Sequence, residues 1–369
     1  MFTESTEAGS TLPRHSYQEY CAGLFLATMA NPPQFTASGL PTDLHLVLAP
    51  MEGVIDAVMR AQLTALGGYE RCVTEFVRVS KTVLPPRVFH RYCPELEHGG
   101  HTPSGTPVYV QLLGSDPTLM AANAVRAAEL GAPGIDLNFG CPAKTVNNSL
   151  GGAALLRTPD VMAAVCSAVR EALPPDIPLT AKIRLGFDDD SLFDALVAAT
   201  TGAGISELTV HARTRRQGYR PPAHWHQLAR AVEQSPVPVI ANGELWSITD
   251  VANCAKASGC NRFMLARGAL CRPDLGRMVR AATSGDSYQS LSWSETAPLL
   301  AHFLAENRAH YDPRHAVNPV KQWLVYLKHY FPQAATLFES VKRLNCPDAM
   351  AQALDQHYQT LGVNLVDAA

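Results

Sequence analysis

The chain has 369 residues, of which 47% are apolar, and its formal net charge is −3 at pH 7. A chain of this length buries a large core and has room for one large domain and a smaller one. The slightly negative charge excludes a protein that binds nucleic acid through overall basicity, so any such surface has to be local. No stretch reaches the roughly eighteen apolar residues of a membrane span, and the first residues lack the pattern of a secretory signal. We therefore expect a cytoplasmic protein with no membrane partner.

The nine cysteines are scattered along the chain and form no C-x-x-C pair. This spacing fits neither a zinc site nor a redox dithiol, and an odd number does not suggest a disulfide framework. We therefore expect reduced cysteines and no bound metal.

Residues 1–41 are rich in Ser, Thr, Gly and Pro, with one short apolar run at 24–29. A segment of this composition buries too little apolar surface to offset the entropy lost when a chain becomes ordered. We expect a mostly disordered N-terminal tail.

Between residues 42 and 287, short runs rich in Val, Ile and Leu alternate with longer amphipathic stretches, which is typical of βα units. Eight strands are predicted, at 46–49, 72–76, 108–112, 135–138, 179–183, 207–211, 238–242 and 262–266, with helices at 117–131, 159–173, 191–203 and 248–257. This count and length predict an α/β fold, a TIM (β/α)8 barrel. A doubly wound open sheet is the alternative, but such sheets usually have fewer strands, and no G-x-G-x-x-G follows the first strand.

The alternation stops before residue 288. Helices are predicted at 295–309, 318–330, 336–343 and 348–361, separated by Pro and Asn, with no strand between them. Residues 288–369 are therefore predicted to form a small C-terminal all-helical domain.

Polar residues collect at the carboxyl ends of the predicted strands, where a TIM barrel has its active site. Any one of them could be a structural residue, but every strand end carries at least one, and buried charges are costly unless a partner or ligand neutralises them. We therefore predict a polar ligand in the barrel mouth. The last two strand ends, "NGE" at 242–244 and "ARG" at 266–268, contain Gly and open helices, as phosphate sites commonly do. The ligand is expected to be a phosphorylated cofactor.

Residues 308–343 form the clearly basic segment, with six Lys or Arg against two acidic residues. Lys321 and Lys328 are seven positions apart and share one face of a helix, as cations that follow a nucleic-acid backbone would. A solvated helix face is the alternative explanation.

A set of motifs resembles those of the tRNA-dihydrouridine synthases. The motifs are "LAPMEGVID", "TEFVRV", "VQLLGSDP", "GIDLNFGCPAKTV", "AKIRLGF", "LTVHARTRRQGY", "PVIANGEL" and "ARGAL". "TEFVRV" and "KQWLVYLKHYFP" look most like the bacterial C subfamily, which reduces the uridine at tRNA position 16. The resemblance covers about residues 45–350.

The resemblance implies that the barrel mouth binds FMN and that NADPH or NADH is the reductant. Lys182 would stabilise the anionic reduced flavin, because a cation near that edge of the ring offsets the developing charge. Ala266 stands where relatives usually have Gly, and we expect the change to be harmless because it is costly only if φ must be positive. The implied cofactor-binding residues are Pro50, Met51, Glu52, Gln111, Lys182, His211, Asn242, Gly243, Glu244, Ala266 and Arg267.

Cys141 lies between Gly140 and Pro142, directly after a predicted strand. In the reaction that the resemblance implies, hydride from the flavin adds to C6 of uracil and leaves an enolate that needs a proton at C5. A thiol that keeps its proton is a suitable acid, so we predict that Cys141 is the catalytic proton donor. A thiolate that attacks C6 as a nucleophile is the alternative, and it requires a lowered pKa.

The resemblance also implies tRNA as the partner of a monomeric enzyme, with the target uridine flipped out of its stack. Trp323 does not share the face of the two lysines, so packing between domains is the alternative for it. Two other functions remain open, an FMN-dependent barrel oxidoreductase that acts on a free pyrimidine and a non-catalytic tRNA-binding protein. The implied tRNA contacts are Arg78, Asn138, Tyr219, Lys321, Trp323, Lys328 and Arg343.

Overall fold

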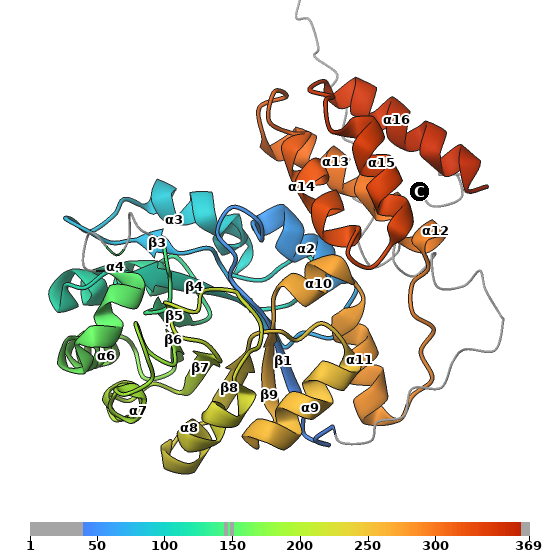
Figure 1. The fold of residues 1–369 in the computed structure, drawn as a ribbon. Coiled ribbons are helices and arrows are strands. Elements are labelled where there is room, and N and C mark those ends of the chain that lie inside the picture. Colours follow the sequence, from blue (N-terminus) through green and yellow to red (C-terminus); the bar gives the residue numbers. More distant parts are fainter. Residues whose placement is uncertain (1–39, 144–146, 148–150, 363–369) are drawn as a thin grey trace, which may run out of the picture.

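The computed structural model describes residues 40–143, 147 and 151–362, so the predicted tail lies almost entirely outside the described residues. The strands form one parallel sheet in the order β2-β1-β9-β8-β7-β6-β5-β4-β3, and a further pairing of β2 with β4 closes it into a barrel (Figure 1). Because β2 and β3 are two parts of the second barrel strand, this is the predicted (β/α)8 barrel. The strands are β1 (His45–Leu48), β2 (Arg71–Val73), β3 (Val77–Arg78), β4 (Val108–Leu113), β5 (Ile135–Asn138), β6 (Leu179–Arg184), β7 (Glu207–His211), β8 (Val239–Asn242) and β9 (Arg262–Leu265).

The second barrel strand is interrupted, which corrects the continuous strand predicted at 72–76. Val73 pairs with Tyr109 and Val77 pairs with Leu112, so four steps along this strand face three steps along β4. The extra residue is a β-bulge, a feature that often re-aims a side chain beside an active site. Val73 packs inside the barrel whereas Val77 packs in the layer between barrel and helices. The bulge turns Glu75 toward the barrel mouth.

The outer helices begin where capping residues satisfy their first backbone N–H groups. The side chain of Asp56 accepts from the Met59 N–H at 2.9 Å at the start of α2, and Asp116 accepts from Leu119 at 2.8 Å at the start of α4. The four predicted barrel helices are all present. The elements are α2 (Ala57–Ala65), α3 (Pro86–Tyr92), η1 (Pro94–His98), α4 (Pro117–Glu129), η2 (Gly152–Arg157), α6 (Pro159–Ala172), α7 (Phe193–Thr201), η3 (Trp225–Gln227), α8 (Leu228–Gln234), α9 (Ile248–Ser258), α10 (Arg267–Cys271) and α11 (Leu275–Ser284).

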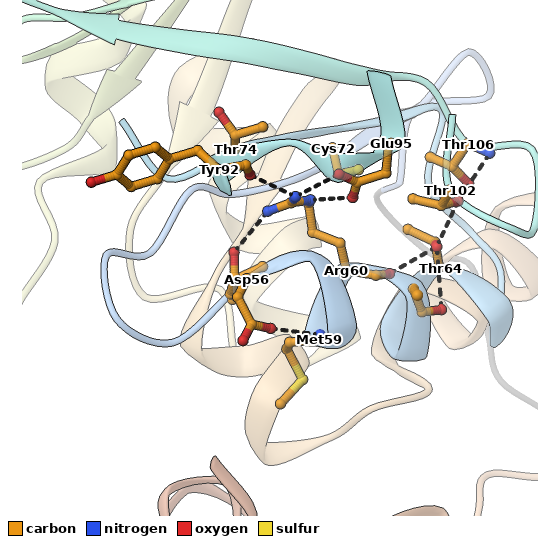
Figure 2. Close-up of polar contacts among 12 residues, drawn as sticks. Asp56, Met59, Arg60, Thr64, Cys72, Thr74, Tyr92, Glu95, Thr102 and Thr106 are labelled. Atoms are coloured by element: carbon orange, nitrogen blue, oxygen red, sulfur yellow. Dashed lines mark hydrogen bonds and ion pairs between the residues drawn. The ribbon is translucent and has the colours of Figure 1, made fainter. Parts of the chain in front are cut away.

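A buried ion pair fastens α2 to η1 and so supports the first loop of the barrel mouth (Figure 2). Arg60 is fully buried and donates to both carboxylate oxygens of Glu95, at 2.8 and 2.9 Å. The same guanidinium donates to the carbonyls of Ile55 and Tyr92, at 3.2 and 3.0 Å. Arg60 therefore holds the end of the Met51–Asp56 loop through Ile55.

The C-terminal region is helical and packs against one side of the barrel mouth (Figure 1). Trp323 is 1% exposed, packs edge-on against Phe303 at 5.0 Å, and donates from Nε1 to the carbonyl of Leu270 at 3.1 Å. Burial of an indole removes about 200 Å² from water, which stabilises the contact by roughly 5 kcal/mol. The third predicted helix begins four residues earlier than expected because Pro332 occupies its first turn. The helices are α12 (Trp293–Thr296), α13 (Pro298–His310), α14 (Asn318–Leu327), α15 (Pro332–Val341) and α16 (Pro347–Thr360).

Candidate active site

The carboxyl ends of the barrel strands surround a cavity of about 400 Å³. This volume lies within the usual range for sites that hold a cofactor or small ligand. The cavity brings together Cys141 and all the residues predicted to bind the cofactor, although their roles stay predictions. These lining residues are Pro50, Met51, Glu52, Gln111, Lys182, His211, Asn242, Gly243, Glu244, Ala266 and Arg267.

Cys141 is partly buried at the cavity wall, and neighbouring groups hold its loop. Asn138 Oδ1 accepts from the backbone N–H groups of Gly140 and Cys141, at 3.0 and 2.9 Å. Arg184 Nε donates to the carbonyl of Gly140 at 2.7 Å. Burial raises the pKa of the Cys141 thiol and Glu52 adds to the rise, while a backbone hydrogen bond and nearby cations oppose it. A raised pKa keeps the proton on sulfur at neutral pH, which favours an acid over a nucleophile.

Lys182 places a cation inside the barrel mouth. Its Nζ donates to Asn242 Oδ1 at 3.1 Å, and burial together with the charge of Arg184 lowers the pKa of Lys182 to about 8. An ammonium group has three donors, and Asn242 is its one hydrogen-bond acceptor among the described residues. The remaining donors are suited to an anionic or carbonyl oxygen of a ligand.

His211 lines the cavity from β7, the strand next to the one that carries Lys182, and is neutral, because burial and the surrounding cations, Arg184 first among them, hold its pKa well below the ordinary value. Gly243 lies against this ring with φ of 116°, and a Cβ at that position would come within 2.7 Å of His211 Cδ2. Only glycine fits both the left-handed backbone and the contact.

Glu244 lines the cavity and is held in place by an ion pair and a hydrogen bond. Its carboxylate forms an ion pair with the fully buried Arg213 at 2.6 Å and accepts from the backbone N–H of Ala223 at 2.5 Å. Glu244 has φ of 55°, which is strained for a residue with a side chain. Its carboxylate is thus engaged by the protein, and a cofactor contact at this position would use the backbone. Sequence reasoning missed Arg213, whose partner is distant in the chain.

Ala266 has φ of −128°, so the backbone is not left-handed there, and the expectation that the change from Gly is harmless stays a prediction. The guanidinium of Arg267 lies over the rings of Trp246 and Tyr219, 4.8 and 5.4 Å from their centroids. Such cation–π contacts hold the charge at the edge of the cavity. Trp246 also lines the cavity and was missed, because nothing in its local sequence distinguishes it.

The predicted tRNA contacts fall into separate groups. Arg78, Lys328 and Arg343 are exposed, and Tyr219 is 55% exposed beside the cavity. Asn138 is 9% exposed and lines the cavity. These assignments stay predictions.

Two residues of α14 differ from the sequence-based interpretation. Lys321 Nζ donates to the carbonyl of Leu344 at 2.7 Å and so ties α14 to the segment after α15. Trp323 is buried against the barrel, and we therefore correct its assignment as a tRNA contact and adopt the alternative of packing between domains. Tyr326, which sequence reasoning missed, reaches the cavity from the same helix.

The loop after Cys141 includes residues 144–146 and 148–150, which lie outside the described residues. Among the residues that the structure does describe, no helix is long and apolar enough to cross a bilayer. Within the same residues, no three His, Cys, Asp or Glu side chains are arranged to hold a metal ion.

The fold and the cavity together define a TIM-barrel enzyme with a polar ligand site and a protonated thiol at its mouth. The chain belongs to the dihydrouridine synthase family, because the model described as "Dihydrouridine synthase (Dus)" matches residues 47–361. A tRNA-dihydrouridine(16) synthase of Pseudomonas putida is 48% identical over 301 residues, which cover 81% of this chain and 93% of the relative. A second, from Ralstonia nicotianae, is 49% identical over 300 residues, covering 81% and 92%. These relatives confirm the family resemblance found in the sequence.

Proposed function

We propose that this chain reduces the uridine at position 16 of tRNA to 5,6-dihydrouridine, with FMN as cofactor and NADPH or NADH as reductant. Family membership and relatives named tRNA-dihydrouridine(16) synthase at 44–49% identity support the reaction and the position. The observation that carries the proposal is Cys141, a thiol with a raised pKa at the wall of a cavity that also contains the cations Lys182 and Arg267. An acid and an anion-binding wall are the two elements that this reduction needs from the protein.

The residues around the cavity fit FMN. Lys182 has donors left for the polar edge of a flavin ring, His211 and Met51 offer flat or apolar contact, and Arg267 with Gly268 suits a phosphate. A Cβ at Gly268 would come within 2.1 Å of the Leu245 carbonyl oxygen, so the backbone is closely packed there. When bound, the flavin supplies the hydride that reduces the base.

The chain itself supplies the proton. Cys141 Sγ donates it to C5 of the uracil ring, and burial keeps the thiol protonated until then. Asn138 and Arg184 hold the loop that carries this sulfur, through Gly140. The positive charges of Arg184 and Lys182 stabilise the thiolate that remains after the transfer.

For tRNA, we propose a division into a catalytic barrel at 42–287 and a tRNA-binding helical domain at 288–369, in a monomeric cytoplasmic enzyme. The exposed cations Lys328 and Arg343 lie on the helical region, and Arg78 lies on the barrel rim. Tyr326 of the helical region reaches the cavity, which supports a target base that is held by both parts. Contacts of this kind make tRNA affinity fall with salt.

The test is the dihydrouridine content of tRNA from a strain without the gene, mapped at each D-loop position. Loss at position 16 with restoration by the wild-type gene is expected. Restoration should fail with Cys141→Ala and succeed with Cys346→Ala, which changes an exposed cysteine away from the cavity. Unchanged dihydrouridine at every position, or a purified protein without the visible absorption of flavin, would refute the proposal.

A further inference from the structure

Asp136 is a buried carboxylate to which the proposed reaction gives no part. It belongs to β5 and is 1% exposed. Thr180 Oγ1 donates to one of its oxygens at 2.6 Å, and Gln111 Nε2 donates to the other at 2.7 Å. A buried carboxylate is costly even when it is hydrogen-bonded, so an apolar residue here would be the simpler choice for stability alone.

The bond to Gln111 is the first link of a continuous chain that ends at Cys141. Gln111 Oε1 accepts from Asn138 Nδ2 at 2.7 Å. Asn138 Oδ1 in turn accepts from the backbone N–H groups of Gly140 and Cys141. Two side chains, Gln111 of β4 and Asn138 of β5, therefore connect the buried carboxylate to the backbone of the proposed proton donor.

The chain has a direction that its two ends impose. A carboxamide can be turned over with almost no change of shape, which exchanges its oxygen with its NH₂ group. An ionised carboxylate only accepts, so Gln111 must present its NH₂ group to Asp136 and its oxygen to Asn138. Asn138 must then present its NH₂ group to Gln111 and its oxygen to Cys141. If Asn138 turned over, its NH₂ group would face the backbone N–H of Cys141. If Gln111 turned over, its oxygen would face the carboxylate of Asp136.

We propose that Asp136 is a positioning residue that sets the orientation of the Gln111 and Asn138 amides and thereby fixes the backbone of Cys141 at the cavity wall. The backbone of Gln111 is itself fixed, since its N–H donates to Thr74 Oγ1 at 3.0 Å. The catalytic consequence rests on the proposed role of Cys141, whereas the structural consequence does not.

Burial raises the pKa of Asp136, and the hydrogen bonds from Thr180 and Gln111 and the charge of Lys182 oppose that rise. The donors thus favour the ionised, accept-only form that the direction of the chain requires.

The test is a double-mutant cycle of Asp136→Asn and Asn138→Asp in the full chain with its bound cofactor. Asp136→Asn lets the Gln111 amide turn over, which would place its NH₂ group against the NH₂ group of Asn138. Asn138→Asp places a second acceptor-only group opposite the Gln111 oxygen. The double variant reverses the whole chain: the new amide at 136 donates to Gln111, and Gln111 donates to the new carboxylate at 138, which still accepts from Cys141. Every hydrogen bond is then satisfied again.

The readout is hydrogen exchange of the Cys141 amide in protein labelled with ¹⁵N-cysteine, with the signal assigned by its loss in Cys141→Ser. Loss of one hydrogen bond corresponds to roughly a tenfold faster exchange, which is expected for each single variant. The double variant should return to within about twofold of the wild type. Exchange in the double variant as fast as in the faster single variant would overturn the proposal.

Thr180→Val is the matched control, because it removes a hydrogen bond from the same carboxylate and leaves the direction of the chain intact. Its Cys141 exchange should equal that of the wild type, and an increase as large as that of Asp136→Asn would overturn the proposal in favour of a general effect on the core. If Asp136→Asn does not fold, the proposal is decided by whether the Cys141 amide exchanges more slowly in the double variant than in Asn138→Asp. Exchange does not depend on dihydrouridine formation, so an intact cycle in a protein without that activity would refute the proposed function alone.

Discussion

Replacement of Cys141 by Ala should slow uridine reduction by about 10²–10⁴-fold, the usual contribution of a positioned general acid. Burial raises the thiol pKa above its ordinary value of 9.0, so fewer than about one in a hundred thiols is ionised at pH 7. The assay is a single turnover, in which tRNA in excess reoxidises the pre-reduced enzyme and the visible absorbance of flavin is followed. Cys346→Ala is the control, and reduction of the enzyme by NADPH should be unchanged in both variants.

The pH dependence separates the acid from a nucleophile. An acid acts in its protonated form, so the single-turnover rate should fall as the pH rises through the raised pKa of Cys141. Lys182, whose pKa is lowered to about 8, loses its charge at a lower pH than that at which Cys141 loses its proton. Loss of this charge also lowers the single-turnover rate as the pH rises. A thiolate nucleophile would instead become about tenfold more active per pH unit below its pKa. A rate that rises between pH 6 and 8, or a Cys141→Ala variant within about threefold of the wild type, would refute the reasoning.

Three further predictions follow from contacts described above. Lys182→Gln should weaken flavin binding about 10–100-fold, as expected for a lost charged hydrogen bond, in a fluorescence titration in which Lys256→Gln serves as the surface control. Arg60→Met should lower the free energy of unfolding, measured by thermal melts, by about 3–5 kcal/mol, because Glu95 is left buried without its partner. Arg91→Met is the control and should change it by less than about 1 kcal/mol. Trp323→Ala should cost about 3–5 kcal/mol and make the helical region more sensitive to limited proteolysis, while Gln322→Ala, on an exposed face of α14, should do neither.

The barrel and most of the cavity could be predicted from sequence because both follow from local patterns. Short β-branched runs define the strands, and parallel strands deliver their carboxyl ends to the same rim. The polar residue after each run therefore has to reach the mouth, as Gln111, Lys182 and Asn242 do. No pairing partner has to be known for that inference.

The parts that were missed depend on contacts between distant segments. Tyr326 reaches the cavity only because Trp323 docks α14 against the barrel, and a helical pattern does not say where its helix will pack. Arg213 looks like an ordinary loop residue until the fold brings it to Glu244. Asp136 is one polar residue in a buried strand, and its role depends on partners in β4 and β6.

The bulge at residues 74–76 makes this segment more sensitive to its length than to its composition. Side chains alternate in direction along a strand, so the extra residue is what lets Val77 face outward although it lies four positions after the inward-facing Val73. Deletion of a single residue here would restore a regular ladder with β4. Val77 would stay opposite Leu112 on the outer face, but residues 74–76 would lose the local kink that the bulge introduces. Among related chains, insertions and deletions should therefore avoid this stretch even where its residues vary.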